Sequence, residues 1–189
     1  MFKLTRAKKL LISVMLALSA FVPSTGFCED ARIDDVKVSW TPNLKASFQV
    51  KDAFTKDIEE AIKSGMPTSF TFIIELERVN TVWFNEEVGR WEFKHTVKYD
   101  TLKEEYEISL DETGEKGIRT KDINEMKTLM VTGNSISITP AHLIPGAEYE
   151  LRIMAELRTT ELPFLLNYML FFVKIWDFET GWYSYSFRP

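Results

Sequence analysis

The strongest constraint on the fold is an alternation of apolar and polar residues that recurs along most of the chain. From Trp91 to Tyr99, every second residue is aromatic, aliphatic or histidine, and the residues between them are charged or threonine. Successive side chains of an extended strand point to opposite faces, so this period of two indicates strands with one buried face. Such strands need another sheet to cover them, and the sequence therefore predicts a mainly β, antiparallel sandwich. The same pattern recurs at 36–40, 44–50, 70–76, 106–110, 136–138, 149–157 and 183–187.

Two segments have helical spacing instead. Apolar residues at 54–62 recur at intervals of four and three, and Gly65 follows where a C-terminal cap is expected. Thr120 is expected to cap a second helix, whose apolar stripe runs from Ile123 to Met130. We expect each helix to cover an open end or edge of the sandwich.

The spacing Leu-x-Pro-x-x-x-Tyr from Leu143 to Tyr149 resembles the tyrosine corner of immunoglobulin-like and fibronectin type III sandwiches. The resemblance implies that the Tyr149 hydroxyl donates to buried backbone a few residues upstream. The run from Val38 to Pro42 resembles the strand that carries the buried tryptophan of fibronectin type III domains, here Trp40. The separation of Trp40 and Tyr149 exceeds that family's spacing, which implies an expanded or a convergent sandwich. The fold class we expect is an immunoglobulin-like β-sandwich with two short added helices.

The first 28 residues have a different composition. Four basic residues among the first nine precede an apolar run of 13 residues from Leu10 to Val22. A helix needs about 20 apolar residues to cross a bilayer, so this run is too short for a stable span. A basic start, a short apolar middle and a small-residue tail predict a signal peptide over 1–28, followed by a single domain over 29–189. We expect export by the general secretion route to the bacterial periplasm.

Cleavage near Cys28 changes the chemistry of the chain. It is expected after Gly26 or after Cys28, and the acidic residues that follow favour the second site. Phe27 is too large for the residue before a lipidated cysteine, and the remaining chain has no cysteine for a disulfide. Removal of four basic residues from 23 leaves 19 against 28 acidic residues, a net charge of −9. This acidity excludes nucleic acid as a partner and disfavours broad binding to anionic lipid. The oligomeric state stays open.

Catalytic and metal chemistry has little support in the sequence. His95 and His142 show no partner set, and His95 lies in the apolar register of its strand, as a core or rim residue would. The segment Asp111–Glu115 lacks the alternating ligand spacing of a calcium loop and is interpreted as a hairpin turn. Adjacent acidic residues such as Glu104 and Glu105 point to opposite faces of a strand rather than across a cleft. We expect no enzyme, no catalytic residue, no metal and no cofactor.

Large aromatic residues are the feature that most suggests recognition. Trp83, Phe84, Arg90 and Trp91 flank a polar turn, and Trp and Arg are common anchors of protein interfaces. The alternative is that these rings close one end of the core. We take the four residues as binding candidates for an envelope protein partner.

The most apolar stretch after the leader is 162–176. We expect a loop over 159–167, and then a central strand buried on both faces and paired with 182–187. Phe164, Leu165 and Leu166 lie in this loop without alternation, so they either seal the sandwich end or form a patch for a partner or ligand.

Taken together, the chain after the leader resembles an uncharacterised family of bacterial exported proteins, domain-of-unknown-function family 4390. The resemblance implies an exported envelope protein and supplies no activity. It rests on Glu60-Ala61-Ile62, Gly65-Met66-Pro67, Glu75-Leu76-Glu77-Arg78, Tyr99-Asp100-Thr101-Leu102, Tyr106, Tyr149 and Leu162-Pro163 before Trp176.

Three functions remain open at this level. The leading hypothesis is a non-catalytic protein-interaction module in the periplasm. The second is a carrier of an apolar ligand, which needs a cavity between the sheets. The third is a hydrolase with an unrecognised acid pair, which needs convergent carboxylates with a raised pKa.

Export gives the first testable prediction. Mass spectrometry of the protein from a periplasmic fraction should find a chain that starts at Glu29, or at Phe27 if the nearer site is cleaved. A membrane-retained product that begins at Met1 would contradict the predicted signal peptide.

Overall fold

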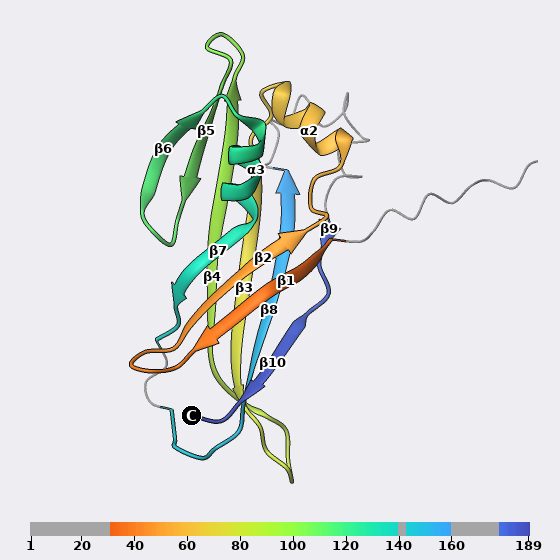
Figure 1. Ribbon diagram of the computed structural model, residues 1–189. Helices are drawn as coiled ribbons and strands as arrows, with labels where there is room; N and C mark the ends of the chain where they lie inside the picture. Colours follow the sequence, from red (N-terminus) through yellow and green to blue (C-terminus); the bar gives the residue numbers. More distant parts are fainter. Residues whose placement is uncertain (1–30, 140–142, 160–177) are drawn as a thin grey trace, which may run out of the picture.

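The computed structural model describes residues 31–139, 143–159 and 178–189, whose strands form two antiparallel sheets (Figure 1). The smaller sheet has the order β1-β2-β7, and the larger has the order β10-β8-β3-β4-β5-β6, with β9 paired to β8. This confirms the predicted mainly β, antiparallel sandwich. The strands are β1 Arg32–Ser39, β2 Lys45–Lys51, β3 Thr68–Arg78, β4 Glu86–Asp100, β5 Glu105–Leu110, β6 Glu115–Thr120, β7 Thr132–Ser137, β8 Tyr149–Thr159, β9 Phe178–Glu179 and β10 Tyr183–Phe187.

The order of the strands is compatible with the immunoglobulin-like arrangement. In that arrangement strands A, B and E share one sheet, and strands C, F and G share the other. Here β1, β2 and β7 correspond to the first set, and β3, β8 and β10 to the second. Strands β4, β5 and β6 then extend the larger sheet beyond the position of strand C.

The core lies between the two sheets and is centred on β3. Phe70, Phe72 and Ile74 are fully buried, because alternate residues of β3 face the smaller sheet. Phe48 of β2 meets Phe72 across the interface, with ring centroids 5.5 Å apart. Gly133 of β7 makes room for this contact, since a Cβ atom there would lie 2.7 Å from the Phe48 ring.

Two helices complete the layer that the smaller sheet begins. Helix α2 (Lys56–Lys63) packs on β4, and helix α3 (Ile123–Val131) packs on β4, β5 and β6. The first predicted helix and its C-terminal glycine are confirmed, since Gly65 follows α2 with a φ of 88°, and the structure adds Thr55 as the N-cap that accepts the Ile58 amide. The predicted cap of the second helix is wrong by two residues. Asp122 caps α3 through the Asn124 amide, while the Thr120 hydroxyl accepts the Asp122 amide instead.

At the corner before β8, Tyr149 makes the expected hydrogen bond to upstream backbone, but the donor and the acceptor are exchanged. Tyr149 is 1% exposed, and its hydroxyl accepts the Ile144 amide at 2.9 Å rather than donating. Trp40 departs from the expectation of a buried tryptophan, since it is 36% exposed and stacks on Phe187 at the rim. The reason is that β1 ends at Ser39, so Trp40 lies beyond the sheet rather than between the sheets.

Three outermost strands are irregular. The pairing of β1 with β2, of β2 with β7 and of β5 with β6 shifts register at one point each. In the outermost strand of each pair, one residue has a positive φ: Asp35 at 51°, Ser135 at 52° and Gly117 at 72°. These are β-bulges, which bend and twist a strand and interrupt its ladder of hydrogen bonds.

Several sequence predictions fall outside the described residues. These are the signal peptide, the loop over 159–167 beyond its first residue, and the buried strand that follows it. What the structure does show is that β10 pairs with β8, from Tyr183 opposite Ile153 to Phe187 opposite Tyr149. Within the described ranges, no helix is both long enough and apolar enough to cross a membrane.

The corner gives a stability prediction. Replacing Tyr149 with Phe should lower the free energy of unfolding by about 1 kcal/mol, because the Ile144 amide loses its protein acceptor but stays close to water. Urea denaturation measures this change. Tyr185→Phe is the control, since the Tyr185 side chain is only half-buried and its hydroxyl bonds to no described group. Equal midpoints for Tyr149→Phe and the unmodified chain would mean that the corner bond contributes nothing.

Candidate functional site

The hairpin between β3 and β4 carries the most exposed aromatic residues of the described chain. Val82, Trp83 and Phe84 are 86%, 77% and 85% exposed, although each is large and apolar. The hairpin projects beyond the rest of the sandwich (Figure 1). The rings of Trp83 and Phe84 meet edge to face, with centroids 6.3 Å apart and planes at 87°. We call these three residues the aromatic tip.

Hydrogen bonds at its base define the conformation of the aromatic tip. The Asn80 side chain accepts the Val82 amide at 3.1 Å, which folds the loop locally. The Asn85 side-chain oxygen accepts the Asn80 amide at 3.3 Å, and the Asn85 side-chain nitrogen donates to Glu77 at 3.0 Å. Asn85 therefore joins the two ends of the loop through Asn80, and it joins the loop to the outer face of β3 through Glu77.

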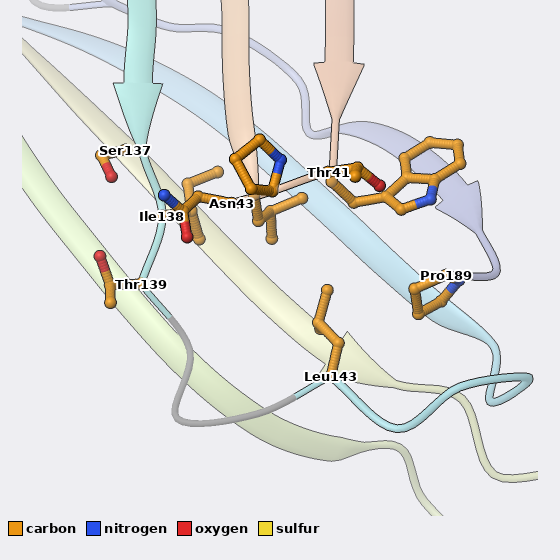
Figure 2. Close-up of a pocket in the computed structure, with 10 residues that line it drawn as sticks. Thr41, Asn43, Ser137, Ile138, Thr139, Leu143 and Pro189 are labelled. Carbon is orange, nitrogen blue, oxygen red and sulfur yellow. The ribbon is translucent and has the colours of Figure 1, made fainter.

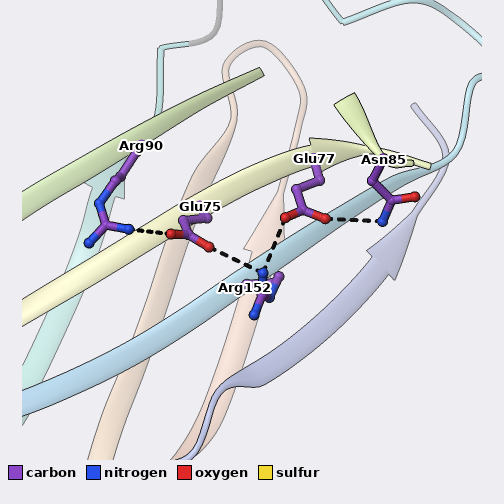
Figure 3. Close-up of polar contacts among 5 residues, drawn as sticks. All are labelled: Glu75, Glu77, Asn85, Arg90 and Arg152. Atoms are coloured by element: carbon purple, nitrogen blue, oxygen red, sulfur yellow. Dashed lines mark hydrogen bonds and ion pairs between the residues drawn. The ribbon is translucent and has the colours of Figure 1, made fainter. Parts of the chain in front are cut away.

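The bond to Glu77 is one end of a polar network on the outer face of the larger sheet (Figure 3). Arg152 of β8 donates to Glu77 at 3.1 Å and to Glu75 at 3.3 Å, and Arg90 of β4 pairs with the other oxygen of Glu75. The two carboxylates are only 15% and 21% exposed, so these pairs are screened less than ordinary surface pairs.

An aromatic ring supports this network from the start of β10. The Arg152 guanidinium lies 4.4 Å from the centroid of the Trp182 ring, within the range of a cation–π contact. Trp182 is 37% exposed. The network therefore joins β4, β3, β8 and β10 and ends at the aromatic tip.

The structure brings together only part of the predicted set. Trp83 and Phe84 form the aromatic tip, whereas Arg90 lies in the polar network on the outer face. Trp91 lies on the inner face, where it packs against the core, and its ring covers Gly89. Adjacent residues of a strand point to opposite faces, which separates Arg90 from Trp91. Trp91 is thus a core-edge residue. The candidates Phe164, Leu165 and Leu166 lie outside the described residues.

His95 is fully buried, as its register predicts, and the structure adds its partners. Its Nδ1 lies 3.2 Å from the Met130 carbonyl, which can only accept, so Nδ1 donates. Its Nε2 lies 2.9 Å from one oxygen of Glu112, in the confirmed turn between β5 and β6. The second Glu112 oxygen is buried and has no partner in the described part of the chain. His95 and Glu112 are 17 residues apart in the sequence, so the sequence pattern could not predict that they are in contact.

Ionisable groups with a shifted pKa do not converge on one cleft. A hydrogen bond from Lys51 lowers the pKa of Asp34, and the backbone amide of Lys103 lowers the pKa of Asp100. Burial raises the pKa of Tyr106. The two carboxyl groups are shifted downward, which is the opposite of the raised pKa that a general acid needs. No group of three or more potential metal ligands is present among the described residues.

These features define an antiparallel β-sandwich with a projecting aromatic hairpin and a polar network behind it. The family described as "Domain of unknown function (DUF4390)" matches residues 31–186, and the chain belongs to this family. The resemblance inferred from the sequence is thereby confirmed. No curated protein and no solved structure matches the chain.

The network gives a second stability prediction. Arg152→Met keeps the aliphatic stem but leaves Glu75 and Glu77 with one partner fewer each, so unfolding should become easier by roughly 1–3 kcal/mol. Lys94→Met on the same sheet is the matched control, because the Lys94 side chain is 52% exposed and its ammonium lies 3.9 Å from Glu92. That change should be nearly neutral. If urea denaturation gives the same midpoint for both variants, the network does not stabilise the fold.

Proposed function

We propose that this protein is an exported cell-envelope protein that works as a non-catalytic protein-interaction module, with the aromatic tip as its contact surface. The observation that carries the proposal is the exposure of Trp83 and Phe84 on a hairpin whose base is fixed by Asn80 and Asn85. Contiguous exposed apolar side chains mark interaction surfaces. Export rests on the predicted signal peptide.

The geometry of the aromatic tip suits an anchor that inserts into a partner. Tryptophan is enriched among the few residues that supply most of the binding energy of an interface. A loop that is already ordered loses less conformational entropy on binding than a flexible one. Two ion pairs lie at the base of the hairpin, Arg78 with Glu86 and Arg152 with Glu77. The proposed partner is therefore a protein with an apolar cleft.

The other hypotheses have less support. An apolar carrier would need space between the sheets, and that region is occupied by side chains such as Phe48 and Phe72 in ring contact. A hydrolase would need convergent carboxylates, whereas Glu75 and Glu77 of the polar network are each bound to Arg152.

Capture of partners from intact envelope tests the proposal. The double variant Trp83→Ser, Phe84→Ser should keep the melting temperature, because both side chains face solvent. It should lose the captured protein, since truncation of an anchor costs about 2 kcal/mol or more, roughly thirtyfold in Kd.

Leu102→Ser is the matched control. Leu102 is 95% exposed, but it lies in the β4–β5 turn at the opposite end of the molecule (Figure 1). This variant should capture the same protein as the unmodified chain. If the tip variant also captures it with unchanged affinity, the aromatic tip is not the contact surface.

A further inference from the structure

A cavity of about 510 Å³ lies at the end of the sandwich that carries the aromatic tip (Figures 1 and 2). Its walls are the β1–β2 loop from Trp40 to Leu44, the end of β7 with the two residues that follow it, Leu143 ahead of β8, and Pro189. Val82, Trp83 and Phe84 do not line it, so the cavity is separate from the aromatic tip. Its size falls within the range of small-molecule sites, roughly 300–1,000 Å³.

The floor of the cavity is apolar and fixed. Leu44 and Ile138 are 3% and 1% exposed, and the Ile138 amide donates to the Leu44 carbonyl at 2.9 Å. At the rim, Trp40 stacks on Phe187 with ring centroids 5.3 Å apart, and Phe187 stacks on Tyr149 at 5.8 Å. The tryptophan ring is thus held by the corner rather than free to collapse into the cavity.

The polar side chains of the lining are uncharged. Thr41, Asn43, Ser137 and Thr139 supply three hydroxyl groups and one amide, and Figure 2 shows these residues around the opening. Within the described residues, none of these side chains makes a hydrogen bond, so all four can bond to a ligand. Among the described residues that line the cavity, no side chain is ionisable, although 27% of the chain is charged.

We propose that this cavity binds a neutral saccharide. A sugar ring presents apolar C–H faces together with hydroxyl groups, which match the floor of Leu44 and Ile138 and the polar rim. A fatty acid would leave the rim groups without partners, which costs free energy. An anionic ligand would lose hydration without meeting an opposite charge, because no lining side chain among the described residues is cationic. The lining therefore selects an uncharged ligand with many hydroxyl groups.

Binding of defined saccharides tests this site. The protein, expressed from the complete coding sequence, is titrated with maltotriose, cellotriose and chitotriose, and amide NMR shifts and tryptophan fluorescence are recorded. At least one trisaccharide should give saturable shifts confined to the amides of Thr41, Asn43, Leu44 and 137–139. Asn43→Ala and Thr139→Ala should each raise its Kd roughly tenfold, because each removes one hydrogen bond. Both residues are exposed, so the melting temperature should not change.

Asn134→Ala on β7 is the matched control, since Asn134 is exposed and does not line the cavity. It should leave the Kd unchanged. The proposal is overturned if none of the three saccharides gives saturable shifts, or if the Kd is unchanged in both Asn43→Ala and Thr139→Ala. Saturation of the same amides by palmitate alone, or by trigalacturonate as tightly as by a neutral sugar, would equally overturn it.

Discussion

The pairing of β3 with both of its neighbours determines where the polar network, the aromatic hairpin and the tyrosine corner lie. Strand β3 pairs with β8 from Thr68 opposite Thr159 to Arg78 opposite Tyr149, and with β4 along the same length. This register sets Glu75 opposite both Arg152 and Arg90, which creates the polar network. It also sets the end of β3 beside the start of β8, so that the aromatic hairpin and the tyrosine corner share one end of the sandwich.

Because the hairpin and the corner share one end of the sandwich, the aromatic tip and the uncharged cavity lie close to each other. Loops of a β-sandwich cluster at its two ends and carry most of its contacts with other molecules. Here the Val79 amide donates to the Glu148 carbonyl at 2.9 Å, which joins the hairpin to the corner loop. The hairpin projects as a convex apolar anchor, while the neighbouring loops enclose a concave uncharged cavity. Both are held by backbone that the core makes rigid.

Most of the strands follow from the sequence, whereas the contacts between strands and the exposure of Trp83 and Phe84 do not. Alternation identifies a strand and its buried face, as it does for β4 and the burial of His95. Alternation carries no information on which strands are neighbours. The bonds of Arg152 to Glu75 and Glu77, and of Glu112 to His95, could therefore not be predicted from the sequence. The observed N-cap of α3 is Asp122 rather than the predicted Thr120, because threonine and aspartate both favour capping positions. Only the path of the chain decides which of the two residues caps the helix. Trp40 was misplaced because the alternation continues one residue past the end of β1.

The bulges in the outermost strands bear on how the protein behaves at high concentration. A regular edge strand offers a row of free amide and carbonyl groups on which another chain can add a strand and begin a fibril. At Asp35, Ser135 and Gly117 the positive φ turns the backbone out of line and breaks this row. A chain with 13% aromatic residues and an exposed apolar hairpin is thereby protected from polymerising through the edges β1, β7 and β6.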